Sequence, residues 1–87
     1  MNNKVLVKLI IPEIDESFDI FIPINEILWK VKKMLVKSVS DLTLKSLDIN
    51  RNYLLVNKNT LEIYQNNIQI SNTDIENGTE IILISAK

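Results

Sequence analysis

The side chains that most often carry out chemistry in proteins are missing from this sequence. It has no histidine and no cysteine, so it lacks the commonest general base, a thiolate nucleophile and the best zinc ligands. The carboxylates of Glu13, Asp15, Glu16 and Asp19 cluster in one stretch, but their spacing does not match a calcium loop. We interpret this stretch as a solvated acidic turn. We therefore predict a non-enzymatic protein with no catalytic residue, no metal site and no cofactor.

Lysines form the one basic concentration, at Lys30, Lys32, Lys33 and Lys37. Such a cluster can attract nucleic acid or an anionic membrane surface, but it is also typical of the solvent-facing side of a helix. The formal net charge of −1 gives no general attraction to nucleic acid, and Trp29 is the only aromatic residue near the lysines. We predict no binding to nucleic acid. Trp29 either covers the margin of a sheet or is a partly exposed anchor for a protein partner.

These lysines belong to the one stretch with sustained helical periodicity, residues 25–39. Apolar residues recur there at helical spacing and form one stripe, whereas Lys30, Lys33 and Lys37 fall on the opposite side. Asn25 is a suitable N-cap, because its side-chain oxygen can accept from the free N–H groups of the first turn. The pattern predicts a helix that packs on one face of a sheet through Leu28, Val31, Leu35 and Val39.

Runs typical of strands precede and follow the helix. They cover residues 4–11, 17–22, 53–56, 61–64 and 79–85. The first two runs form a hairpin, and a 3₁₀-like turn is expected at 73–75. Residues 40–47 suit either a short helical turn or a packed loop. Gly78 is expected to adopt a positive φ before the last strand. The order ββαββ predicts an α+β domain over residues 1–87, with a mixed sheet, one main helix on one face, and the last strand parallel to the first in the centre.

Chain length and composition indicate the size of the core and the cellular location of this domain. Its 87 residues suffice for one hydrophobic core, and 46% of them are hydrophobic. No apolar run approaches the roughly 20 residues that a membrane-spanning helix needs. The polar start of the chain, at residues 1–4, does not resemble a signal peptide. We therefore predict a cytoplasmic protein that does not insert into a membrane.

Strand alternation also places aliphatic side chains on the sheet face away from the helix. If Leu54 and Val56 point toward the helix, Leu55 points away from it, and Ile82 and Ile84 point away if their neighbours point inward. Small domains rarely leave such a patch uncovered, so we predict a protein partner or self-association. A one-residue error in register would reverse these assignments. The predicted protein-binding residues are Leu6, Ile10, Leu55, Ile82 and Ile84, together with Trp29.

With this order of elements, the chain resembles ubiquitin. Residues 54–61 are similar to the strand–turn–strand of ubiquitin-like domains, and residues 73–81 to their turn into the last strand. The resemblance implies a β-grasp fold, and it places Leu55 and Ile84 in ubiquitin's recognition patch with Ile82 between them. The C-terminal sequence Ser85-Ala86-Lys87 lacks the Gly-Gly pair of ubiquitin and the sulfur carriers. A modifier or sulfur-carrier protein is therefore the less favoured alternative.

A closer resemblance is to the small bacterial YukD/EsaB proteins, which are ubiquitin-like and associated with type VII secretion. Residues 18–23, 54–63 and 75–81 carry it, although Asn59 stands where a glycine is more usual. The resemblance implies a cytoplasmic, non-catalytic accessory or adaptor protein of that secretion system. It also implies that the partner is a protein, with a membrane component of the secretion apparatus as the candidate.

Overall fold

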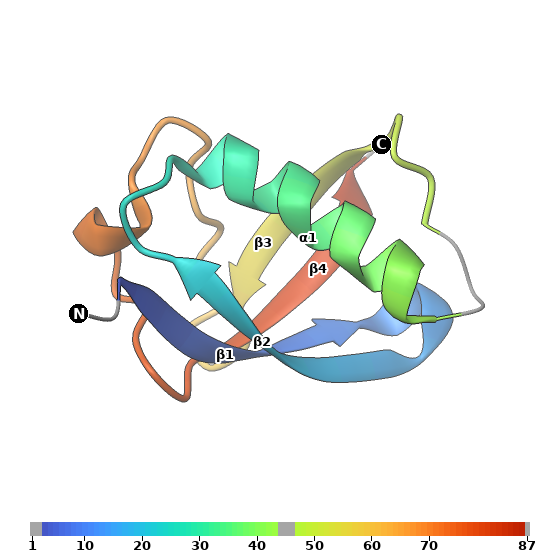
Figure 1. The fold of residues 1–87 in the computed structure, drawn as a ribbon, viewed down its shortest axis with the longest axis horizontal. Coiled ribbons are helices and arrows are strands. Elements are labelled where there is room, and N and C mark those ends of the chain that lie inside the picture. Colours follow the sequence, from blue (N-terminus) through green and yellow to red (C-terminus); the bar gives the residue numbers. More distant parts are fainter. Residues whose placement is uncertain (1–2, 44–46, 87) are drawn as a thin grey trace.

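The computed structural model describes residues 3–43 and 47–86, and within them one α-helix lies across a four-stranded sheet (Figure 1). The ββαββ order predicted from the sequence is confirmed. Two single-turn 3₁₀ helices lie in the connections, η1 (Pro12–Ile14) and η2 (Ile70–Asn72). The main elements are β1 (Lys4–Ile11), β2 (Glu16–Pro23), α1 (Leu28–Leu42), β3 (Asn52–Asn57) and β4 (Glu80–Ala86).

The sheet has the strand order β2-β1-β4-β3, with the first and last strands side by side in the centre. β1 pairs antiparallel with β2, and β3 pairs antiparallel with β4. β1 and β4 are parallel, with Leu9 opposite Ile81 and Ile10 opposite Ile82. The predicted parallel pairing at the centre of the sheet is therefore confirmed.

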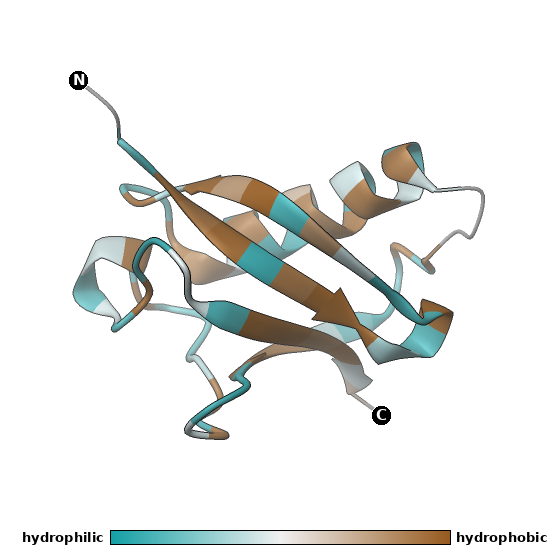
Figure 2. Ribbon diagram, turned by 90° about the horizontal axis from the view of Figure 1, so that it is seen from below, coloured by the Kyte–Doolittle hydropathy of each residue, from teal (hydrophilic) through white to brown (hydrophobic). Residues whose placement is uncertain are grey.

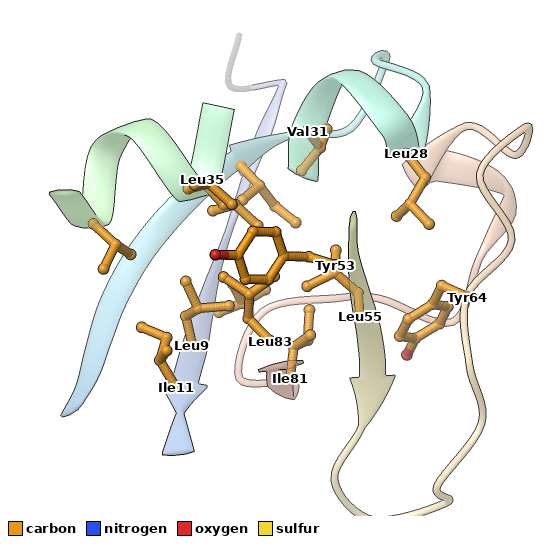
Figure 3. Close-up of a cluster of buried hydrophobic side chains, with 14 of the residues drawn as sticks. Leu9, Ile11, Leu28, Val31, Leu35, Tyr53, Leu55, Tyr64, Ile81 and Leu83 are labelled. Carbon is orange, nitrogen blue, oxygen red and sulfur yellow. The ribbon is translucent and has the colours of Figure 1, made fainter. Parts of the chain in front are cut away.

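The hydrophobic core fills the space between α1 and the sheet face beneath it. Figure 3 shows side chains of α1 pointing toward side chains from β1, β3 and β4. Full burial of such an aliphatic side chain contributes roughly 1.5–3 kcal/mol, so this layer supplies most of the drive to fold. The predicted apolar stripe is confirmed and is joined by Val36; the buried helix residues are Leu28, Val31, Leu35, Val36 and Val39.

The start of α1 differs from the prediction. The helix begins at Leu28, and Asn25 does not cap it. Instead, the N–H groups of Leu28 and Trp29 donate to the carbonyls of Ile68 at 2.8 Å and Asn66 at 3.2 Å. Because the main chain of a distant loop satisfies these donors, the helix needs no side-chain cap.

The predicted strand at residues 61–64 is not formed. Val56 and Ile63 make only an isolated bridge, because Leu61 has a φ of +63° and turns the chain out of the extended conformation. The 3₁₀ turn expected at residues 73–75 lies three residues earlier, at Ile70–Asn72.

Two smaller predictions concern Gly78 and residues 40–47. Gly78 has the expected positive φ, at +90°, and its N–H donates to the Leu6 carbonyl at 2.8 Å. A short helical turn within residues 40–47, one of the two alternatives there, is not separate at its start, since α1 continues through Leu42. The rest of that prediction falls on residues 44–46, which lie outside the described residues.

Candidate functional site

Aliphatic side chains gather on the face of the sheet that α1 does not cover, which we call the outer face. Figure 2 looks onto this face and shows hydrophobic segments along β1, β2 and β4, with the helix behind them. Strand pairing sets Leu6 beside Phe21, Ile10 beside Ile82, and Leu54 beside Ile84. The exposed fraction is 37% for Leu6 and 55% for Phe21, while the other four are half-buried. The apolar residues that keep exposed surface on the outer face are Leu6, Ile10, Phe21, Leu54, Ile82 and Ile84; Val56, expected to point toward the helix, lies beside Ile82 on this outer face and is buried there.

The prediction for β3 was wrong by one residue. Leu55 points toward α1, is fully buried, and lies opposite Leu83 of β4. Leu54 takes the place expected for Leu55 and lies on the outer face beside Ile84. Residues 53–56 are all apolar, so their pattern does not indicate which alternate positions face the helix. No signal in the sequence of this strand would have corrected the assignment.

For β1 and β4 the inward and outward positions follow the prediction. Leu9, Ile81 and Leu83 are buried under α1, whereas Ile82 and Ile84 lie on the opposite face. Leu6 and Ile10 occupy the same outer side of β1. Protein binding by these residues stays a prediction, because their orientation alone does not test it.

Charged residues form a row across the outer face. Lys8 of β1 lies between Asp19 of β2 and Glu80 of β4, and the Lys58 ammonium is 3.7 Å from the Glu80 carboxylate. Figure 2 shows a hydrophilic segment on each of β1, β2 and β4, which together form a band across these strands. The band separates Leu6 and Phe21 from a larger aliphatic cluster. We call that cluster the outer patch; it consists of Ile10, Leu54, Ile82 and Ile84.

The acidic turn between β1 and β2 has a structural role at the edge of this face. The Ser85 N–H of β4 donates to Oε1 of Glu13 at 2.7 Å. Hydrogen bonding to the side chain and the N–H of Ser85 lowers the pKa of the Glu13 carboxyl below its usual value. Among the described residues, His, Cys, Asp and Glu side chains form no group of three that could hold a metal ion.

Trp29 lies at a second surface, away from the outer face. A groove of about 780 Å³ runs between α1 and β3, and we call it the α1–β3 groove. The exposed fraction of Trp29 is 40%, so the residue is neither buried nor free of contacts. The lining residues used below are Trp29, Lys32, Lys33, Lys37, Ile49 and Arg51.

The cations of the α1–β3 groove differ in their contacts. Lys32 Nζ donates to the Tyr53 carbonyl at 2.7 Å, and partial burial lowers the pKa of this lysine. The Arg51 Nε is 3.8 Å from an Asp48 carboxylate oxygen. The ammonium of Lys33 lies 5.4 Å from the centre of the Trp29 ring. Sequence reasoning identified the lysines and Trp29, but it missed Ile49 and Arg51, which precede β3.

The described part of the chain contains no candidate membrane-spanning helix. The helix described there is not long and apolar enough to cross a lipid bilayer.

Comparison with known proteins gives structural matches only. No model of a known protein family matches the sequence, and no curated protein matches it. A chain of the "MycP5-free ESX-5 inner membrane complex" is 13% identical with a TM-score of 0.79, covering 98% of this chain and 21% of that one. The UBL domain of Plasmodium falciparum Dsk2 is 12% identical with a TM-score of 0.72, covering 95% and 99%. A chain of the toluene 4-monooxygenase HD complex is 7% identical with a TM-score of 0.76, covering 95% and 99%.

At these identities the similarity shows the fold alone. The predicted fold class is confirmed: the chain has a ubiquitin-like β-grasp fold, with one helix packed on a four-stranded mixed sheet. It spans about a fifth of the length of the matching ESX-5 chain, at 21%. Proteins of different activities share this fold, so the function must be argued from the surfaces.

Proposed function

We propose that the chain is a non-catalytic, cytoplasmic accessory protein of a bacterial type VII secretion system, and that it binds a protein partner through the outer face. The observation that carries this proposal is the outer patch, where Ile10, Leu54, Ile82 and Ile84 lie together on neighbouring strands. α1 lies on the opposite face of the sheet, and each of these side chains keeps part of its surface exposed. Partly exposed aliphatic clusters of this kind are typical of protein-binding surfaces.

Two further observations support the link to secretion. The sequence resembles the YukD/EsaB proteins over residues 18–23, 54–63 and 75–81. A chain of the ESX-5 inner membrane complex, a type VII secretion assembly, has the same fold with a TM-score of 0.79. A membrane component of the secretion apparatus is therefore the candidate partner, with a second copy of this chain as the alternative.

The geometry of the outer patch suits such binding. The patch lies on the two central strands and on β3, so its side chains are held by main-chain hydrogen bonds and by the core beneath them. The row of charges through Lys8 and Glu80 borders it on one side. An apolar centre with a polar rim is the usual anatomy of a protein interface.

The test is affinity capture from a lysate of the source organism that includes solubilised membranes, with wild type and Ile84→Lys as baits. The control is Met34→Lys, which places the same charge on an exposed apolar residue of α1, on the other side of the molecule. Circular dichroism checks that both variants fold. We expect Ile84→Lys to lose secretion-system proteins that wild type and Met34→Lys retain.

Two results would contradict the proposal. Equal capture by all three baits would remove the outer patch as the binding surface. A covalent adduct at the C-terminus, seen by intact-mass analysis of protein from its native cell, would favour the modifier or carrier class instead.

A further inference from the structure

We propose that the α1–β3 groove is a second binding site, and that its ligand is an acidic, extended protein segment with an apolar side chain. The groove and the outer patch share no residue. The groove opens between the helix and the edge strand β3, whereas the outer patch faces away from the helix. The two sites could therefore be occupied together, and each can be tested without the other.

The charge of the groove is opposite to that of the whole chain. The formal net charge of the protein is −1, yet the described residues that line the groove include Lys32, Lys33, Lys37 and Arg51 and no Asp or Glu. A cleft lined by one sign of charge concentrates ligands of the opposite sign and raises their association rate. This local excess of positive charge selects an acidic ligand.

Two of these cations are available to a ligand. In the part of the chain that the structure describes, Arg51 and Lys58 have carboxylate neighbours, at 3.8 Å and 3.7 Å, whereas Lys33 and Lys37 form no ion pair. Both lysines are exposed on the solvent side of α1. Lys32 is different, because its ammonium is already used by the Tyr53 carbonyl. Lys33 and Lys37 are therefore the residues we expect to contact acidic side chains.

Aromatic geometry favours a protein segment over a nucleic acid. Base stacking needs a free aromatic face, but the ammonium groups of Lys30 and Lys33 lie over the Trp29 ring, at 5.6 Å and 5.4 Å from its centre. The other aromatic residue of the groove, Tyr53, is buried and its hydroxyl donates to the Asp48 carbonyl at 2.9 Å. The groove therefore offers positive charge without a stacking platform.

Apolar surface in the same groove indicates the other half of the ligand. Ile49 has an exposed fraction of 70%, and Trp29 of 40%, although both are large apolar residues. An apolar side chain of the ligand could cover Ile49, the more exposed of the two, while its acidic neighbours contact the lysines. We expect the ligand to be recognised through its side chains rather than its main chain. The Tyr53 carbonyl at the edge of β3 already accepts from Lys32, and this limits the pairing of a ligand strand with β3 there.

The probe is a short synthetic peptide of glutamates around one central leucine. Trp29 is the only tryptophan of the chain, so its fluorescence reports directly on the groove. Comparison probes are the same peptide with glutamine in place of glutamate, and a single-stranded oligothymidine of equal charge. We expect the glutamate peptide to change Trp29 emission saturably at low salt, the glutamine peptide to bind far more weakly, and added salt to weaken binding.

Matched variants localise the effect. Lys37→Glu should raise the Kd of the glutamate peptide about tenfold, because it removes one attraction and adds a repulsion. Lys58→Glu makes the same change of charge on a residue outside the groove and should change the Kd less than about twofold. Ile84→Lys, on the outer patch, should bind the peptide as wild type does.

Three outcomes would overturn the proposal. One is equal binding of the glutamate and glutamine peptides, which would remove the role of charge. Another is an equal loss in Lys37→Glu and Lys58→Glu, which would show a response to net charge rather than to the groove. The third is tighter binding of the oligothymidine with the same dependence on Lys37, which would assign the groove to nucleic acid.

Discussion

Both faces of the sheet carry aliphatic residues, but only one face is covered by α1. On β3, Leu55 points to the helix and has no exposed surface, while the adjacent Leu54 is half-buried on the outer face. The same contrast separates Leu83 from Ile84 on β4. Apart from the charged row of the outer face, the large difference between the faces is that α1 covers one of them. Among the aliphatic residues, type therefore does not separate core from surface; the position of the helix does.

The aliphatic residues of the two faces therefore have different roles. Aliphatic residues under α1 are buried by folding itself, so they stabilise the domain. Aliphatic residues of the outer patch keep part of their apolar surface in water, and its burial can still stabilise a complex.

The largest expected effect tests this contrast with adjacent leucines. Leu55→Ala should lower the free energy of unfolding by about 2–5 kcal/mol, because it leaves a cavity in a closely packed layer. Leu54→Ala should cost about 1 kcal/mol or less, since water can fill the space of a half-buried side chain. Urea denaturation of both variants measures the difference. Equal losses would mean that the two faces contribute alike to stability.

A smaller effect is expected at the polar exception on the inner side of β3. Asn57 is buried; its Nδ2 donates to the Tyr64 hydroxyl at 2.9 Å, and that hydroxyl donates to Oδ1 of Asp74 at 2.6 Å. Tyr64→Phe should lower the free energy of unfolding by about 1–2 kcal/mol, because the Asn57 amide loses a buried partner. Tyr53→Phe is the control and should cost less, since the Asp48 carbonyl that it frees belongs to an exposed residue.

Because of the Tyr64 hydroxyl, we expect the free energy of unfolding to depend on pH in the alkaline range. Burial and the hydrogen bond to Asp74 raise the pKa of Tyr64 from 10.0 to about 12. The folded state thus disfavours the phenolate, so this contribution to stability is complete below pH 10 and is lost as pH rises toward 12. Between these values wild type should lose stability more steeply than Tyr64→Phe. Parallel pH dependence of the two proteins in urea denaturation would contradict this account.

The smallest effect concerns the edge of the outer face. Hydrogen bonding to the side chain and the N–H of Ser85 lowers the pKa of Glu13 from 4.5. The contribution of Glu13 to stability is therefore present above pH 4.5 and is lost as pH falls through the lowered pKa. Glu13→Gln should make the acid loss of stability shallower in thermal unfolding across a pH series. Glu26→Gln, a substitution on the exposed segment before α1, is the control and should leave the acid limb as in wild type. An unchanged acid limb in Glu13→Gln would mean that this contact does not matter for stability.

Local pattern was enough to predict the elements with clear alternation. The first strand was predicted at residues 4–11 and is observed at Lys4–Ile11, because Lys8 marks its outer side and Pro12 ends it. The apolar stripe of α1 and the positive φ of Gly78 were predicted for similar local reasons.

Contacts that hydrophobic periodicity does not encode, some between distant parts of the chain and one within a turn, explain what was missed. The helix start depends on the carbonyls of Asn66 and Ile68, and the Gln69 side chain donates to the Asn25 carbonyl at 2.7 Å. Leu61 adopts a positive φ although it is not glycine, and its N–H donates to the Asn57 carbonyl at 2.8 Å. Neither contact has a signature in local periodicity.

The candidate surfaces also contain some residues that the local pattern predicted and others that it did not. Ile82, Ile84, Leu6 and Ile10 could be placed on the outer face from alternation, but the uniform apolar run of β3 left Leu54 and Leu55 interchangeable. The α1–β3 groove could not be predicted, because Arg51 reaches the helix lysines only through the tertiary fold.

The central pairing of β1 with β4 also determines when the molecule can finish folding. During synthesis β1 gains β2 at once, but its other edge has no partner until Glu80–Ala86 has been made. Such a high contact order slows folding, and an aliphatic strand with an open edge invites association with other chains. A nascent chain of this protein therefore exposes one edge of β1 to association with other chains until β4 has been made.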